Sequence, residues 1–252
     1  MARIIQILCR RRKNNPLLIG DAGVGKTALA EGLAWRIVNG NIAAPLQDAV
    51  VYSLDITALI AGTKYRGEFE ARMKQVLNAL KDDPQAILFI DEVHTIVGAG
   101  SVSEGTMDIS NLIKPALANG ELRCIGSTTF AECRQIFDKD SALSRRFQKV
   151  TVSEPSVSDA IAILQGVAKV YADFHHVTYT KAALTAAVEL SVKHMHERYL
   201  PDKAIDVIDE AGAYLRLQSK TATTRPKVNV AHIETVIANL ARIPPKTVAR
   251  DD

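Results

Sequence analysis

The chain has 252 residues, of which 47% are hydrophobic and 23% are charged, a composition typical of globular proteins. Its 31 basic and 28 acidic residues give a formal net charge of only +3, which argues against a nucleic-acid or membrane-surface partner. No apolar run reaches the ~18 residues of a membrane span, and no signal peptide is recognisable. The three cysteines are odd in number and lack C-x-x-C spacing, so we expect reduced thiols in a cytoplasmic protein.

Strands and helices alternate along the first part of the chain. Strand candidates lie at residues 16–19, 49–54, 86–90, 123–128 and 148–152, and the third of them contains an apolar run rich in branched and aromatic residues. Helical patterns lie between them, at residues 26–39, 66–81, 108–118 and 131–138. This alternation predicts an α/β fold in which helices sandwich a parallel sheet.

Beyond Glu154-Pro155 the pattern changes to helices only. Ser156 and Thr180 are suited to cap two helices, Pro201 begins a third, and residues 230–241 form a fourth after a loop at 219–227. We therefore expect a large α/β domain over residues 1–154 and a small all-helical domain over residues 155–252. Neither end shows a terminating element, so we expect the chain to be part of a longer polypeptide.

A complete G-x-x-x-x-G-K-[ST] sequence follows the first predicted strand and leads into a helix. This strand–loop–helix context distinguishes a phosphate-binding loop from a chance glycine-rich turn. Loop amides and the helix dipole favour an anion, the Lys26 ammonium can reach the β- and γ-phosphates, and the Thr27 hydroxyl can ligate Mg²⁺. The predicted ATP- or ADP-binding residues here are Gly20, Asp21, Ala22, Gly23, Val24, Gly25, Lys26, Thr27 and Ala28.

An acid pair, Asp91-Glu92, ends the apolar strand predicted at residues 86–90. Open parallel sheets bind ligands at the carboxyl ends of their strands. We therefore expect Asp91 to hold Mg²⁺, usually through water, and Glu92 to be the base that orients the attacking water. Acids at strand ends are common, and it is the combination with the phosphate loop that predicts ATP hydrolysis.

Four further segments are notable, and each has a common alternative explanation. A hydroxyl within Gly-Ser-Thr-Thr at residues 126–129 can fix the attacking water, although a polar strand end is equally common. Arg145 and Arg146 follow a helix, where they can contact phosphate or simply lie on a solvated face. Tyr65 lies between two cations in a glycine-bounded loop, as an exposed contact residue or as a packed aromatic. The basic run at residues 10–13 is a solvated helix end or a subunit-interface patch.

Together these segments resemble the first ATPase module of the Clp/Hsp100-type AAA+ unfoldases, over essentially the whole chain. The resemblance is carried by R-R-K-N-N-P at residues 11–16, G-T-K-Y-R-G-E-F-E at 62–70, F-I-D-E at 89–92, residues 143–149 and Y-L-P-D-K-A-I-D at 199–206. The disaggregase branch inserts a long coiled coil after the third helix of the small domain, where this chain has only residues 219–227. The sequence is therefore most similar to the ClpA type, the ATP-binding subunit of the Clp protease.

The resemblance implies roles for individual residues. The implied first sensor, arginine fingers and polypeptide-gripping pore loop are Thr129, Arg145 and Arg146, and Lys64, Tyr65 and Arg66, respectively. Residues 98–110 would contain a second pore loop. The implied adenine neighbours are Ile4, Ile5, Ile163 and Leu164. Asp202-Lys203 stands where many AAA+ small domains carry a sensor arginine, so that contact is open here.

The resemblance also implies an activity and partners. It implies a homo-hexamer that hydrolyses ATP and threads protein substrates through a central pore to a Clp peptidase, with an adaptor. Alternatives are a nucleotide-gated assembly module, a disaggregase-type chaperone module and a nucleic-acid motor. The near balance of 31 basic and 28 acidic residues argues against the last. Family members add an N-terminal adaptor domain and a second ATPase module, so the module alone is expected to be monomeric and nearly inactive.

Overall fold

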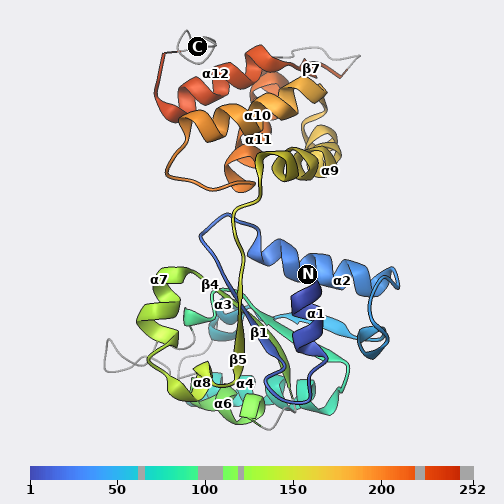
Figure 1. Cartoon of the computed structure of the whole chain (residues 1–252), viewed down its shortest axis with the longest axis vertical. Coiled ribbons are helices and arrows are strands. Elements are labelled where there is room, and N and C mark those ends of the chain that lie inside the picture. The colour runs from blue at the N-terminus through green and yellow to red at the C-terminus, as the bar shows by residue number, and fades with distance from the viewer. Residues whose placement is uncertain (62–65, 96–109, 119–121, 219–224, 245–252) are drawn as a thin grey trace. The chain divides into compact units, whose positions relative to one another are not determined.

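The computed structural model describes residues 1–61, 66–95, 110–118, 122–218 and 225–244 (Figure 1). The chain forms two compact units. The first joins Met1–Gly20 to Lys26–Val152, and the second joins Asp21–Gly25 to Ser153–Asp252. Within the described residues, no helix has the length and apolar character needed to span a membrane.

The first unit is built on a parallel five-stranded sheet with the order β2-β3-β4-β1-β5. The strands are β1 (Asn15–Ile19), β2 (Val50–Ser53), β3 (Ala86–Ile90), β4 (Arg123–Thr128) and β5 (Phe147–Thr151). Every residue of β1 and β3 is buried, as expected for a sheet covered on both faces. Because the strands are parallel, the segments that follow β1, β3 and β4 lie at one edge of the sheet and their starts lie at the opposite edge.

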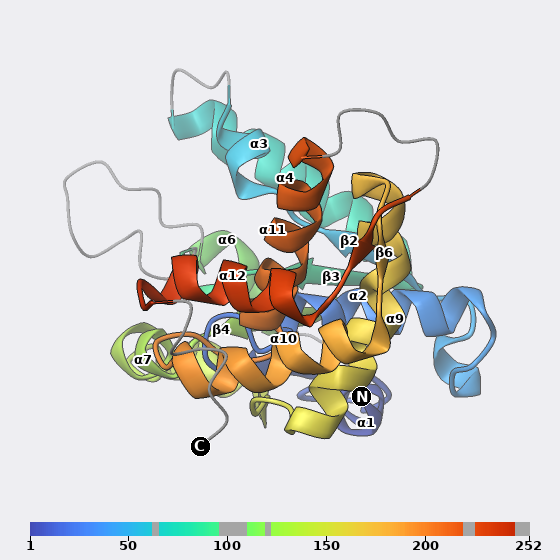
Figure 2. The ribbon, with the colours of Figure 1, turned by 90° about the horizontal axis from the view of Figure 1, so that it is seen from above.

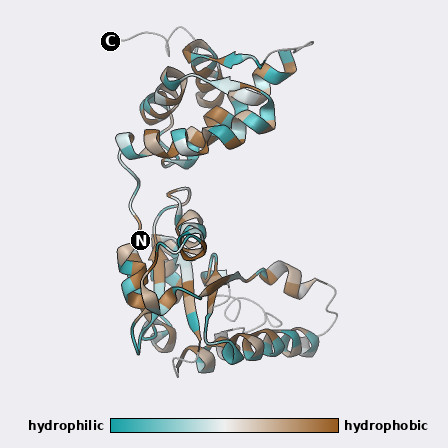
Figure 3. Ribbon diagram, turned by 90° about the vertical axis from the view of Figure 1, so that its right-hand side faces the viewer, coloured by the Kyte–Doolittle hydropathy of each residue, from teal (hydrophilic) through white to brown (hydrophobic). Residues whose placement is uncertain are grey.

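Helices cover both faces of this sheet (Figures 1 and 3). Leu17 and Leu18 of β1 point to opposite faces and enter different apolar clusters. The helices of the cluster around Leu18 are α1 (Ala2–Leu8) and α2 (Lys26–Val38). Those around Leu17 include α4 (Arg66–Asp82) and α6 (Ser110–Ala118). Short elements complete the unit: η1 (Ala44–Leu46), α3 (Ile56–Ile60), α7 (Phe130–Glu132), the π-helical η2 (Cys133–Phe137) and α8 (Ser141–Ser144).

The described part of the second unit is a group of four helices with its own apolar core. The helices are α9 (Val157–His175), α10 (Lys181–His194), α11 (Asp202–Gln218) and α12 (Val230–Ala241). Ser156 and Thr180 cap α9 and α10 as predicted, since their side chains accept from the amides of Asp159 and Ala183. Helices α10 and α12 lie side by side (Figures 1 and 2).

The predicted elements largely agree with the structure, although α3 and η1 were not predicted and residues 108–109 of one predicted helix lie outside the described residues. The strands at 86–90 and 123–128 have the predicted bounds, and the other strands and helices mostly differ by a residue or two. The single helix predicted at 131–138 is instead α7 followed by the π-helical η2. The helices-only prediction for the second unit missed a parallel pair, β6 (Thr178–Tyr179) with β7 (Lys227–Val228), because two-residue strands leave no periodicity to detect. Residue 227 therefore belongs to a strand rather than to the predicted loop.

Candidate nucleotide-binding site

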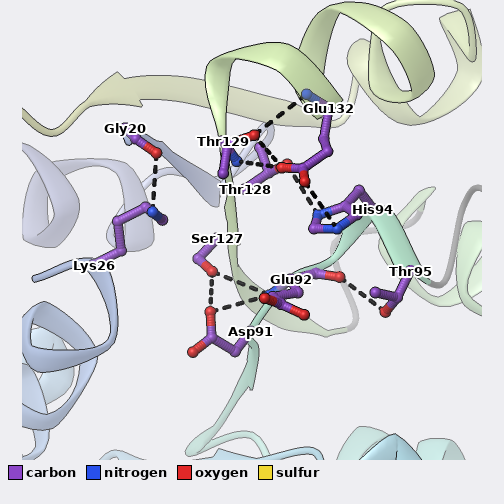
Figure 4. Close-up of polar contacts among 10 residues, drawn as sticks. All are labelled: Gly20, Lys26, Asp91, Glu92, His94, Thr95, Ser127, Thr128, Thr129 and Glu132. Carbon is purple, nitrogen blue, oxygen red and sulfur yellow. Dashed lines mark hydrogen bonds and ion pairs between the residues drawn. The ribbon is translucent and has the colours of Figure 1, made fainter. Parts of the chain in front are cut away.

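The phosphate loop joins the end of β1 to the start of α2. Gly23 and Gly25 have φ angles of +83° and +94°, a region that side chains rarely adopt, so both positions require glycine. At the start of α2 the Lys26 ammonium donates to the carbonyl oxygen of Gly20 at 2.9 Å, which folds this side chain back along the loop (Figure 4). A helix N-terminus and a lysine thus flank the loop, as a bound phosphate requires.

The Asp91 carboxylate lies immediately after β3, between hydroxyls from two other elements. The Thr27 hydroxyl of α2 donates to one carboxylate oxygen at 2.6 Å. The buried Ser127 hydroxyl of β4 donates to the other (Figure 4). Burial alone would raise the pKa of Asp91, but these two hydroxyls, the Glu92 amide and the nearby Lys26 charge outweigh it and lower the pKa below its usual value. Asp91 is therefore held ionised.

The residues present fit a Mg²⁺ ion. The Thr27 hydroxyl and an Asp91 carboxylate oxygen converge to within 2.6 Å, which is the donor set a hard cation prefers. They reach this position from α2 and β3, beside the end of β1. Thr27 and Asp91 are therefore the residues that would hold the ion.

Glu92 has an unusual backbone conformation for a residue with a side chain. Its φ angle is +48°, in the left-handed region. Its amide donates to the Ser127 hydroxyl at 3.2 Å, and the next amide, of Val93, donates to the Ser127 carbonyl at 2.9 Å. The Thr95 amide donates to the Glu92 carbonyl at 2.8 Å. Hydrogen bonds to Ser127 and from Thr95 thus fix the backbone of Glu92, and its side chain is exposed.

Thr129, the predicted sensor, has a structural task in this conformation. It is the N-cap of α7 and forms a capping box with Glu132, whose carboxylate also contacts the Thr129 hydroxyl. That hydroxyl is the main reason the pKa of Glu132 is lowered. The preceding residue, Thr128, is buried and its hydroxyl lies 3.3 Å from Nδ1 of His94, while Nε2 of His94 lies 3.6 Å from Glu132 (Figure 4).

Sequence reasoning missed the roles of His94, Ser127 and Glu132 in this network. The T-x-x-E pattern of a capping box at residues 129–132 could have indicated the last of them. The bridge from Ser127 to both acids depends on the register of β3 against β4, which pairs Ile90 with Gly126 and which no local pattern reveals. The sensor role of Thr129 stays a prediction.

Arg145 and Arg146 lie at the opposite edge of the sheet, between α8 and the start of β5. The five residues of β5 separate the two edges by about 16 Å. Arg146 is half-buried and donates to the carbonyl of Ala142 at 2.6 Å. Arg145 is exposed and has no side-chain partner within the described part of the chain. Neither arginine is therefore near Lys26 of its own chain.

Asp140 fixes the short helix α8 that precedes these arginines. Its carboxylate caps the helix by accepting from the amides of Ala142 and Leu143, and it forms an ion pair with Lys114 at 2.7 Å. Burial would raise the pKa of Asp140, but the Lys114 ammonium and the two amides outweigh burial and lower it.

The structure gives little support for the predicted adenine neighbours and does not describe most of the predicted pore-loop residues. Ile4 is buried in the first unit and Leu164 in the second, so neither offers exposed surface, whereas Ile5 is half-buried and Ile163 is 38% exposed. Their role as adenine neighbours stays a prediction. Lys64, Tyr65 and residues 98–109 lie outside the described residues, and Arg66 is described only as the first residue of α4.

Comparison with known proteins places this site in a family. Residues 16–154 match the profile of the ATPase family associated with various cellular activities (AAA), and residues 156–251 match that of the AAA lid domain. The chain belongs to the AAA ATPase family. The five-stranded parallel sheet and the helical second unit of the AAA module agree with that assignment.

Individual relatives narrow the family further. The AAA module is 58% identical over 251 residues to a ClpA homolog protein of Fuscovulum blasticum, covering 99% of this chain and 31% of the relative. It is 52% identical over 236 residues to ClpC, an ATP-binding subunit of the ATP-dependent Clp protease of Staphylococcus aureus (strain USA300), covering 94% of this chain and 29% of the relative. The predicted resemblance to Clp/Hsp100-type proteins is thus confirmed. The chain spans less than a third of the length of these relatives.

Solved structures of a related protein share the same fold. The chain superposes on a closed-state reconstruction of Hsp104 with ATPγS and FITC casein with a TM-score of 0.89 and 40% identity, covering 100% of this chain and 42% of that one. The S. cerevisiae Hsp104–ADP complex gives the same score and identity over 99% of this chain and 42% of that one. At this identity and coverage the similarity extends over both units.

Proposed function

We propose that this AAA module binds and hydrolyses ATP at the edge of the sheet where β1, β3 and β4 end. The observation that carries the proposal is the convergence of Lys26, Thr27, Asp91 and Glu92 at that edge, with Asp91 held ionised by two hydroxyls. The family match and the Clp ATP-binding relatives support the same activity.

Each residue of the site has a task in hydrolysis. The loop amides and Lys26 bind the phosphates and offset their charge. Thr27 and Asp91 are placed to hold Mg²⁺, which supplies further positive charge when bound. The exposed Glu92 carboxylate takes the position of the base that accepts the proton from the attacking water. Ser127 orients both acids through its hydroxyl, and Thr128 or Thr129 supplies a hydroxyl near the reacting phosphate.

The arginines at the other edge fit a site shared between subunits. Because Arg145 is exposed and lies about 16 Å from its own phosphate loop, its guanidinium is available to a neighbouring subunit rather than to its own site. Arginines supplied in this way raise the rate of nucleotide hydrolysis by roughly 10³–10⁵ in the better-studied enzymes. A homo-hexameric ring in the longer protein provides such neighbours.

We further propose that the longer protein uses this activity to unfold polypeptides and thread them through the ring. The names of the ClpA and ClpC relatives support a Clp peptidase as the partner, and the casein-bound Hsp104 structure supports a polypeptide substrate. The Hsp104 similarity keeps a disaggregase-type role as the second candidate. The free cysteines of the described residues are consistent with a cytoplasmic protein.

Hydrolysis and subunit sharing are tested by mixing variants in the assembled, full-length protein. Glu92→Gln should retain bound ATP but stop turnover, because the metal-binding Asp91 is unchanged. Arg145→Ala subunits should lose turnover alone and regain part of it when mixed with Glu92→Gln subunits, whose arginines are intact. Absence of rescue at every mixing ratio, with hexamers confirmed, would contradict a shared site.

A further inference from the structure

A second candidate binding site lies at the edge of the sheet opposite the phosphate loop. It is a cavity of about 320 Å³ whose polar lining includes Arg10, Arg11, Asn14 and Arg123. Arg10 and Arg11 follow α1, and Arg123 is the first residue of β4. Three arginines from two segments far apart in the sequence therefore line one cavity.

Within the described residues, the positive charge of this cavity has no acidic counterpart. Nη1 of Arg123 is buried and has no hydrogen-bond partner among the described residues. Among the described residues, Arg10 donates to the neutral side-chain amide of Gln148, at 3.3 Å, and to no acid, and Arg11 has no partner there. The described lining of the cavity is basic, neutral polar and apolar, with no acid among those residues. A buried donor without an acceptor is destabilising, and an anion in the cavity would remove that penalty.

We propose that this cavity binds a phosphate-type oxyanion. Guanidinium groups recognise planar pairs of oxygens, which both carboxylates and phosphates present. The charge of the cavity separates the two, because one carboxylate would leave two of the three arginines without a counter-charge. A phosphate group carries about −1.5 to −2 charges and three strong acceptor oxygens at neutral pH. The volume, at the lower end of small-ligand sites, also accommodates a pyrophosphate.

The cavity shares its edge with the arginines proposed to act on the neighbouring subunit. The buried Asn15 side chain accepts from the Cys124 amide, which follows Arg123, and donates to the carbonyl of Arg146 at 3.3 Å. Gln148, the partner of Arg10, lies in β5 directly after Arg146-Phe147. Anion binding here would therefore stabilise the sheet edge from which Arg145 and Arg146 extend.

The test measures phosphate binding with the ATP site weakened. Inorganic phosphate and pyrophosphate are titrated into the Lys26→Ala variant by calorimetry and thermal melting, with NaCl at matched ionic strength to account for screening. We expect saturable binding and a rise in melting temperature. Adding Arg123→Met should weaken binding about tenfold or more, whereas Arg134→Met, which removes an exposed arginine outside the cavity, should change it less than about twofold.

Arg11→Met keeps the test valid if Arg123→Met fails to fold, since Arg11 is exposed and its loss should also weaken binding. Acetate titrated under the same conditions should bind at least tenfold more weakly than phosphate. Three results would overturn the proposal: no saturable phosphate binding, equal affinity in the Arg11→Met and Arg134→Met variants, or equal affinity for acetate and phosphate.

Discussion

The left-handed φ angle of Glu92 predicts backbone strain at this position of the site. A residue with a side chain at a φ of +48° costs about 1–2 kcal/mol relative to the right-handed region, and glycine avoids that cost. Glycine in turn lowers the free energy of unfolding by about 0.4–1 kcal/mol, because it gives the unfolded chain more conformational entropy. The Glu92→Gly variant should therefore be about 1 kcal/mol more stable than Glu92→Ala, although both should lose turnover.

Urea unfolding of the two variants measures this difference, which corresponds to about 2–4 °C in melting temperature for a chain of this size. The matched control is Glu31, an exposed acid within α2, where Glu31→Gly should be about 1 kcal/mol less stable than Glu31→Ala. The sign of the glycine–alanine difference thus reverses between the two sites. If Glu92→Ala proves as stable as Glu92→Gly or more so, the backbone at position 92 is not strained, which would contradict this prediction.

Two further predictions concern packing and capping. A Cβ at Gly212 of α11 would collide with the Tyr179 hydroxyl, so Gly212→Ala should destabilise the second unit by about 1–3 kcal/mol in denaturant unfolding. The control is Gly166→Ala in α9, where a Cβ meets nothing within 4 Å, and it should stabilise the unit by about 0.4–1 kcal/mol. Equal effects of the two variants would contradict this packing. Asp140→Ala should cost about 0.5–2 kcal/mol at neutral pH through loss of the α8 cap. Because the folded-state pKa of Asp140 is lowered, this contribution is present above the ordinary pKa of about 3.9 and is lost as the pH falls below it, so a wild-type advantage that persisted unchanged at pH 2 would refute the assignment.

Much of the first unit could be predicted because its signals are local. A continuous apolar run identifies the buried β3, and Gly23 and Gly25 of the phosphate loop occupy positions whose φ angles require glycine. The acid pair follows directly from the end of β3. Residue types at fixed sequence spacing were sufficient for all of these.

The features that were missed depend on contacts distant in sequence. Ser127 serves both Asp91 and Glu92 only because β4 pairs with β3 in one register. Asn15 looks like an ordinary polar residue before a strand, but it is buried and joins β4 to the loop after α8. The cavity lined by Arg10, Arg11 and Arg123 joins segments more than a hundred residues apart, and no pattern along the chain indicates it.

The most direct test of the proposed site is calorimetric binding of Mg²⁺–ATP to this chain and to two single variants. Glu92→Gln should bind ATP as the wild type does, because Glu92 acts on water and not on the phosphates. Lys26→Ala should lose measurable binding, because the loop amides remain but the lysine charge that offsets the β- and γ-phosphates is gone. Equal affinity of the wild type and Lys26→Ala would contradict the assignment of residues 20–27 as the phosphate-binding loop.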